Sequence, residues 1–154
     1  MPITIAGPVF EQAAVCIPIV RALPDWFGIE AAIAAYEHTL DQLPTLLAYD
    51  AARAVGFVSL QQHTPYAAEV AVMGVLPELH RRGVGRALLE SAQIWLRTRA
   101  VEFLQVKTLG PSHPDAGYAR TRAFYAGLGF RPLEELPQIW GADNPCLIMV
   151  KRLI

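Results

Sequence analysis

One stretch constrains the fold of this 154-residue chain more than any other, and it spans residues 69–99. It begins with EVAVMGV, whose β-branched and apolar residues are typical of a half-buried strand. Pro77 ends that strand, because proline cannot donate a hydrogen bond to a neighbouring strand. From Gly83 to Arg99 the apolar residues recur at helical spacing, with Gln93 among the residues on the opposite, polar face. The stretch therefore predicts a strand, a loop and an amphipathic helix in succession.

The loop between them carries the sequence HRRGVGR at residues 80–86. Its two glycines lack a Cβ atom, so a ligand can approach the backbone closely. The first turn of a helix also has N–H groups without partners and a partial positive charge, which together bind anions such as phosphate. Arg81, Arg82 and Arg86 add positive charge suited to phosphate oxygens. The loop thus predicts a phosphate site, and a plain glycine turn with solvated arginines is the alternative.

Two other phosphate-binding motifs are excluded by the same residues. No Gly-Lys-Ser/Thr follows the loop, so it is not a Walker A loop. A dinucleotide fingerprint requires a third glycine or alanine where this chain has Leu88.

The segment VLPELHRRGVGRALLE (75–90) resembles motif A of the GCN5-related N-acetyltransferases (GNAT), whose signature is Gln/Arg-x-x-Gly-x-Gly/Ala. His80 stands where that family usually has Gln or Arg. Downstream, TRAFYAGLGF (121–130) resembles motif B of the same family. The two motifs have the order and spacing of the family, and the resemblance extends over nearly the whole chain.

Composition restricts the class of protein. The length suits one domain over residues 1–154, and the 53% of hydrophobic residues argues against disorder. A formal net charge of −1 argues against a broad nucleic-acid surface. No apolar run is long enough for a membrane span, and the N-terminus lacks the layout of a signal peptide, so we expect a cytoplasmic protein. Cys16 and Cys146 are expected to be free thiols in the core.

The order of elements predicts a mixed α/β fold with one parallel crossover. The expected strands are 2–6, 45–49, 54–62, 68–75, 101–108, 130–133 and 145–153. The expected helices are 8–23, which Pro18 should kink or split, 29–40, the helix that ends at Arg99, and 117–128. The resemblance adds the acyl-CoA N-acyltransferase (GNAT) fold, with the order β-α-α-β-β-β-α-β-α-β-β and a splayed central pair of parallel strands.

The resemblance implies acetyl-coenzyme A as the acetyl donor and direct transfer in a ternary complex. Its pantetheine arm should lie on the backbone of Met73 and Val75, with Gly74 as a bulge site. The N–H of Val75 should face the thioester oxygen. The residues expected to bind the donor are Met73, Gly74, Val75, His80, Arg81, Arg82, Gly83, Val84, Gly85, Arg86 and Tyr118. Tyr118 occupies the position where motif B usually has asparagine.

Two catalytic residues are implied by the same resemblance. Tyr125 matches the motif B tyrosine, which can protonate the departing thiolate. Glu69 lies where several family members have a general base that deprotonates the amine, often through water. A packed aromatic side chain and a surface carboxylate are the respective alternatives.

The acceptor is expected to be the primary amine of a small molecule. Carboxylates and aromatic rings suit an organic cation, and the candidates are Asp25, Trp26, Phe27, His113, Trp140 and Asp143. A non-catalytic acyl-CoA-binding module and a protein N-terminal or lysine acetyltransferase remain as alternatives. His38 and His63 are expected to be structural, no metal is expected, and the resemblance is compatible with a homodimer.

Overall fold

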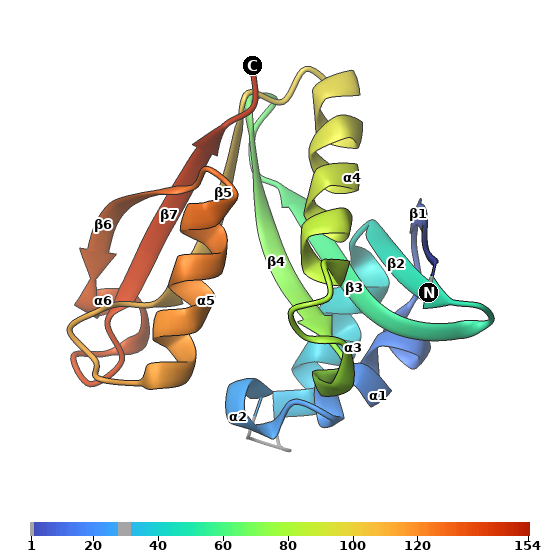
Figure 1. Cartoon of the computed structure of the whole chain (residues 1–154). Coiled ribbons are helices and arrows are strands. Elements are labelled where there is room, and N and C mark those ends of the chain that lie inside the picture. Colours follow the sequence, from blue (N-terminus) through green and yellow to red (C-terminus); the bar gives the residue numbers. More distant parts are fainter. Residues whose placement is uncertain (1, 28–31) are drawn as a thin grey trace. The chain divides into compact units, whose positions relative to one another are not determined.

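The computed structural model describes residues 2–27 and 32–154, with the side chains of Asp25 and Trp26 outside the described part. Its strands form one sheet in the order β1-β2-β3-β4-β5-β7-β6 (Figure 1). The strands are β1 (Ile3–Val9), β2 (Thr45–Asp50), β3 (Arg53–Gln62), β4 (Ala67–Val75), β5 (Phe103–Leu109), β6 (Arg131–Leu136) and β7 (Cys146–Arg152). The helices are α1 (Ala13–Arg21), α2 (Pro24–Phe27), α3 (Ile33–Gln42), η2 (Pro77–Leu79), α4 (Val84–Thr98), α5 (Ala116–Gly127) and α6 (Pro137–Trp140).

The chain divides into two compact units, and strand β4 contributes residues to each. Unit 1 comprises residues 1–61 and 71–96, and unit 2 comprises residues 62–70 and 97–154. The expectation that residues 1–154 form a single domain stays a prediction.

In unit 1, helices α1 and α4 cover opposite faces of the sheet. A Cβ atom at Gly74 would stand 3.1 Å from Leu23 and 3.4 Å from Ile19 at the end of the α1 segment. A Cβ atom at Gly56 would instead stand 3.2 Å from Leu88 of α4 and 3.3 Å from the side chain of Val75. Because the adjacent residues Gly74 and Val75 point to opposite faces of their strand, α1 and α4 lie on opposite faces as well.

In unit 2, the first half of β4 pairs in parallel with β5, from Ala67↔Phe103 to Val70↔Val106. Strand β7 then pairs antiparallel with both β5 and β6. Helix α5 lies along these strands (Figure 1). Its Tyr125 is buried, and so is Leu128 directly after the helix. The mixed α/β fold with a parallel central pair is therefore confirmed.

Some local predictions are wrong. Pro8 and Val9 belong to β1 and not to a helix, because Val9 pairs with Thr45 of β2 and strand pairing outweighs the helical spacing. Pro18 lies inside the single helix α1, so the helix is not split there, and the alternative of a kink stays a prediction. The predicted helix from Ile29 begins in residues outside the described part, and α3 is recorded from Ile33. Helix α6 was not predicted, since four residues are too few for a periodic pattern.

The buried stripe of α4 is rotated from the predicted face. Gln93, predicted on the polar face, is only 4% exposed. Gln93 follows Leu89 by four residues, so the two side chains lie on the same face of the helix, and Leu89 is fully buried. In the described part of the chain, every helix is too short or too polar to cross a lipid bilayer.

The two cysteines are free and buried, as predicted. Burial, reinforced by the negative charge of Asp41, raises the pKa of the Cys16 thiol to about 12. Burial is also the main cause that raises the pKa of Cys146. Both side chains are thus inert thiols at neutral pH and act as core packing.

Candidate active site

The predicted phosphate loop leads from β4 into α4 in unit 1. The backbone turns at Arg81 and Gly83, whose φ angles are +64° and +80°. A Cβ atom at Gly83 would meet nothing within 4 Å, so the approach to the backbone is open there. The bond from Ala87 N–H to the Gly83 carbonyl is the first of the helix. Among the described residues, the N–H groups from Gly83 to Arg86 donate to no backbone carbonyl, and this is the arrangement that accepts an anion.

The arginines around the loop leave it positively charged. Arg81 and Arg82 are exposed. Arg86 lies 3.5 Å from Glu90, but both side chains are more than half exposed. A pair of this kind is worth at most about 1 kcal/mol, so Arg86 can exchange Glu90 for a multiply charged anion. The residues of the loop therefore fit a diphosphate group.

His80 ties this loop to the end of β4. Its Nε2 atom lies 2.7 Å from the carbonyl oxygen of Val75. A carbonyl oxygen can only accept, so the ring nitrogen donates and carries the hydrogen. Gly74, predicted as a bulge site, also leaves room for α1. A Cβ atom there would stand 3.4 Å from Ile19 of α1 and 3.1 Å from Leu23 just after it, so glycine allows α1 to pack closely on the sheet. The bulge and the pantetheine contacts of Met73 and Val75 stay predictions.

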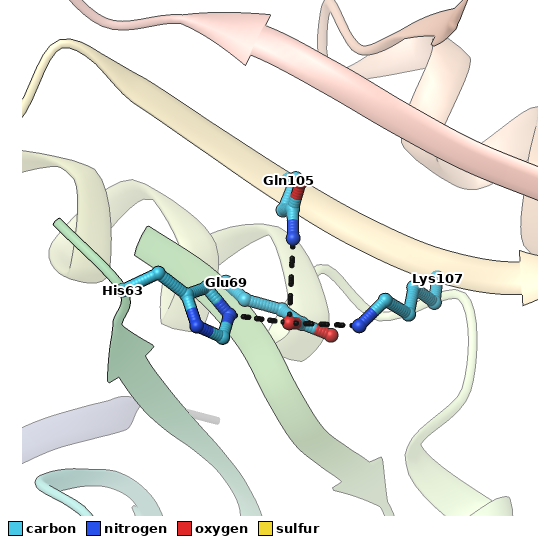
Figure 2. A network of polar contacts seen from close by, with 4 residues as sticks. All are labelled: His63, Glu69, Gln105 and Lys107. Atoms are coloured by element: carbon cyan, nitrogen blue, oxygen red, sulfur yellow. Dashed lines mark hydrogen bonds and ion pairs between the residues drawn. The ribbon is translucent and has the colours of Figure 1, made fainter. Parts of the chain in front are cut away.

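In unit 2, Glu69 is a buried carboxylate held by three donors, and Figure 2 shows them converging on it. The residue is only 8% exposed, which is unlike the surface carboxylate considered as its alternative. Its Oε1 atom lies 2.7 Å from Nε2 of His63, 3.3 Å from Nζ of Lys107 and 3.4 Å from Nε2 of Gln105. Gln105 faces Glu69 across the parallel ladder.

The sequence shows no partner for His63, which was expected to be structural, whereas the structure places its ring against Glu69. His63 lies on the turn between β3 and β4, and Glu69 lies in β4, six residues further along the sequence. Their contact depends on the register across that turn, which the residue pattern alone does not specify. A histidine and a glutamate flanking a short hairpin turn are the only signal that could have indicated the pair.

Tyr125 lies on the buried side of α5. Its ring makes edge-on contacts with Phe124 and Phe130, with ring centroids 5.3 and 5.4 Å apart. Burial raises the pKa of the Tyr125 phenol. The hydroxyl therefore stays protonated at neutral pH and can donate a hydrogen bond, although it is a weaker acid than an exposed tyrosine. Asp115 caps the same helix, since its carboxylate accepts from the N–H of Tyr118 at 3.0 Å.

A cavity of about 470 Å³ opens in unit 2 between the segment after β5 and the segment that connects β6 to β7. Its lining residues are Ser112, His113, Pro114, Glu135, Pro137, Ala142, Asp143 and Pro145. Glu135 accepts hydrogen bonds from the backbone and the hydroxyl of Ser112, at 3.3 and 3.0 Å. The Glu135 side chain lies against Gly110, with its carboxyl carbon 2.7 Å from where a Cβ atom would stand.

The cavity brings together two of the predicted acceptor residues, His113 and Asp143. Within the described part of the chain, the Nδ1 atom of His113 is buried and has no hydrogen-bond partner. The side chains of Asp25 and Trp26 lie outside the described residues. Phe27 lies in unit 1, where its ring packs edge-on against Tyr36 at 5.3 Å. Two carboxylates and an acceptor-capable imidazole suit a cation with N–H donors.

The sequence model of the family described as "Acetyltransferase (GNAT) domain" matches residues 41–132, which include the loop, Glu69 and Tyr125. This chain belongs to the GNAT family. It is therefore an acetyltransferase, and acetyl-coenzyme A, predicted from the sequence as its co-substrate, is confirmed at the level of the family. Comparison of the sequence with curated proteins finds no match.

Solved structures share the fold of this GNAT acetyltransferase at low sequence identity. A GNAT-family protein from Desulfovibrio desulfuricans is 18% identical with a TM-score of 0.84, covering 99% of this chain and 100% of its own. The ribosomal-protein-S18-alanine N-acetyltransferase from Escherichia coli is 19% identical with a TM-score of 0.77, covering 99% and 94%. An aminoglycoside 6'-N-acetyltransferase complexed with coenzyme A is 20% identical with a TM-score of 0.73, covering 100% and 98%.

In the part of the chain that the structure describes, no three histidine, cysteine or carboxylate side chains are grouped so that they could hold a metal ion. The candidate functional groups of this acetyltransferase are the amide loop in unit 1 and, in unit 2, the Glu69 network, Tyr125 and the carboxylate-lined cavity.

Proposed function

We propose that this GNAT acetyltransferase moves the acetyl group of acetyl-coenzyme A to the primary amine of a small molecule, by direct attack in a ternary complex. The observation that supports a small cationic acceptor is the cavity of about 470 Å³ lined by Glu135, Asp143 and His113. Its volume is in the range of small-molecule sites. Its carboxylates complement an ammonium group, which is the form of a primary amine at neutral pH.

The reaction needs two proton movements. The acceptor ammonium first loses a proton to Glu69, and the free amine then attacks the thioester carbon. A C–N bond forms, the C–S bond breaks, and the second proton of the nitrogen leaves as the amide forms. The thiolate takes up one proton, so the products are the acetamide, coenzyme A and one proton released to water.

Each candidate residue has a proposed role in this scheme. The N–H groups from Gly83 to Arg86 bind the pyrophosphate, with Arg81 and Arg82 adding charge. The backbone of Met73 and Val75 binds the pantetheine arm and the thioester. The Tyr125 hydroxyl donates a hydrogen bond to the departing sulfur. Burial keeps this hydroxyl protonated, which supports its role as a donor.

A second candidate acceptor is the N-terminal amine of a protein. It is suggested by the ribosomal-protein-S18-alanine N-acetyltransferase, which shares the fold with a TM-score of 0.77. A non-catalytic acyl-CoA-binding module would bind coenzyme A without turnover on any amine. The cytoplasmic location and the homodimer stay predictions.

A screen for thiol release tests these alternatives. Acetyl-coenzyme A is offered with aminoglycosides, polyamines, amino acids and peptides with free N-termini. We expect turnover on a small amine and a raised KM for that amine in Asp143→Asn, with the KM for acetyl-coenzyme A unchanged. Glu134→Gln is the matched control, because Glu134 is exposed and does not line the cavity. Turnover confined to peptides would instead support the protein acceptor.

A further inference from the structure

The contact between His63 and Glu69 is the shortest in the network of Figure 2. The other two donors, Gln105 and Lys107, both come from β5 and lie at 3.4 and 3.3 Å, which are long distances for hydrogen bonds. His63 approaches from the opposite direction, on the turn between β3 and β4 (Figure 2). Without it, the carboxylate would keep only two long contacts from one strand and could rotate more freely.

The turn that carries His63 does not depend on the imidazole ring. The backbone N–H of His63 donates to the Ala67 carbonyl at 2.9 Å. The hydroxyl of Thr64 accepts from the N–H groups of Tyr66 and Ala67, at 3.1 and 3.0 Å. The side-chain amide of Gln62 also donates to the Thr64 carbonyl, at 3.1 Å, so these bonds close the turn without the imidazole ring. The bond from the ring to Glu69 is therefore additional to what the turn needs.

All three donors meet the same oxygen of Glu69. Oε1 takes the contacts from His63, Gln105 and Lys107, whereas Oε2 accepts from no residue in the described part of the chain. A carboxylate has about two lone-pair directions on each oxygen, so the donors occupy one atom and leave the other available. Oε2 is thus the atom at which Glu69 can take up a proton.

We propose that His63 is a positioning residue of the acetyl-transfer reaction, which holds Oε1 of Glu69 through its Nε2–H so that Oε2 faces the acceptor ammonium. This inference rests on the proposed function, in which Glu69 is the base. This role needs a hydrogen on Nε2 of the ring, which donates to the carboxylate. His63 itself takes no part in the bonds that form and break.

Three variants of histidine test this role. His63→Ala removes the donor, and His63→Gln keeps an N–H at a position similar to Nε2. His38→Ala is the matched control, because His38 is an exposed histidine on α3. We expect His63→Ala to lower kcat by about tenfold to a hundredfold, as loss of orientation at a reacting group does. The KM for acetyl-coenzyme A should be unchanged, and His63→Gln should restore most of kcat.

The result that would overturn the proposal is wild-type kcat in His63→Ala while Glu69→Gln is slow. If Glu69→Gln also turns over normally, the assignment of Glu69 as base in the proposed function fails, and the role of His63 fails with it. A raised KM for acetyl-coenzyme A with normal kcat would likewise contradict a positioning role.

Nitrogen-15 NMR of the imidazole rings gives a readout that does not require turnover. The chain has four histidines, so the His63 signals can be assigned by their loss in His63→Gln. We expect His63 in the wild-type protein to be the Nε2–H tautomer, with ring shifts that move in Glu69→Gln and stay in His38→Ala. The pairing would be disproved by a His63 ring that carries its hydrogen on Nδ1 alone, or by nitrogen-15 shifts of His63 that are the same in wild type and Glu69→Gln. This readout holds even if the screen finds no acceptor.

Discussion

The Nε2 atom of His80 donates to the carbonyl oxygen of Val75 across 2.7 Å. This bond joins the loop before α4 to the last residue of β4. The family resemblance marks position 80 as one usually held by Gln or Arg, and both of those side chains also carry N–H donors. The imidazole therefore preserves a donor at this position, and it fixes the direction in which the loop leaves the strand.

We expect His80→Ala to weaken binding of acetyl-coenzyme A by about two- to tenfold, since a hydrogen bond of this kind contributes about 0.5–1.5 kcal/mol net. His80→Gln should keep most of the affinity. KM for acetyl-coenzyme A and calorimetry with coenzyme A measure the effect. Equal affinity in His80→Ala and wild type would show that the loop is held without the ring.

Gly83→Glu should weaken coenzyme A binding by more than about tenfold, which corresponds to 1.4 kcal/mol. The new carboxylate would stand beside the amides proposed to hold the pyrophosphate. Gly141→Glu is the matched control, because Gly141 also has a positive φ (+95°) and open space at its Cβ position. If calorimetry gives the same affinity for both variants, the amide loop of α4 does not bind the cofactor.

Tyr125→Phe should lower kcat by about tenfold or more and leave the fold intact. Its ring contacts with Phe124 and Phe130 survive the change, whereas the hydroxyl is lost. Thiol release under saturating acetyl-coenzyme A measures kcat, and near-ultraviolet circular dichroism checks the packing. Normal turnover would remove Tyr125 from the mechanism.

The free energy of unfolding should fall as the pH rises above about 9, because burial raises the pKa of Cys16 from 9.0 to about 12. The folded state holds the thiol proton more tightly than the unfolded state. The contribution of Cys16 to the free energy of unfolding is therefore complete below pH 9 and is lost as the pH approaches 12. At 1.4 kcal/mol per pKa unit, the upper limit is about 4 kcal/mol. Denaturant titrations of wild type and Cys16→Ala test this.

The Cys16→Ala variant should show a shallower decline with pH, even though its stability at neutral pH is lower. Tyr125 and Cys146 also have raised pKa values and contribute slopes of the same sign. An identical slope in the variant would mean that Cys16 does not titrate differently in the two states.

The sequence predicted the central elements well, because their signals are local. Neighbouring residues alone specify the end of β4, the loop and α4: these are Pro77, the glycines at 83 and 85, and the helical spacing up to Arg99. Gly129, just after the C-terminus of α5, has a φ of +97°, a conformation that glycine adopts readily at the end of a helix. The segment of Pro8 and Val9 was mispredicted because its partner, β2, lies some 36 residues away along the chain.

The candidate site could likewise be predicted where its signals are local, and not where it depends on contacts between distant segments. The anion loop could be predicted from one continuous segment, whereas the environment of Glu69 depends on the register of three segments. His63 approaches from a turn, and Gln105 and Lys107 come from a strand that is distant in sequence. The burial of Gln93 likewise depends on which side of α4 meets the sheet, and a rotation of a few tens of degrees changes that outcome.

Gly110 does not line the cavity, but it lies against Glu135, which does, so a substitution at Gly110 can change the preference for the acceptor. Because the Glu135 side chain fills the space that any larger residue at 110 would need, such a residue must displace that carboxylate. Directed evolution at this single codon would therefore shift the charge lining the cavity without mutating any of the residues that form it. Enzymes selected in this way should accept amines of different size or charge while their demand for acetyl-coenzyme A stays constant.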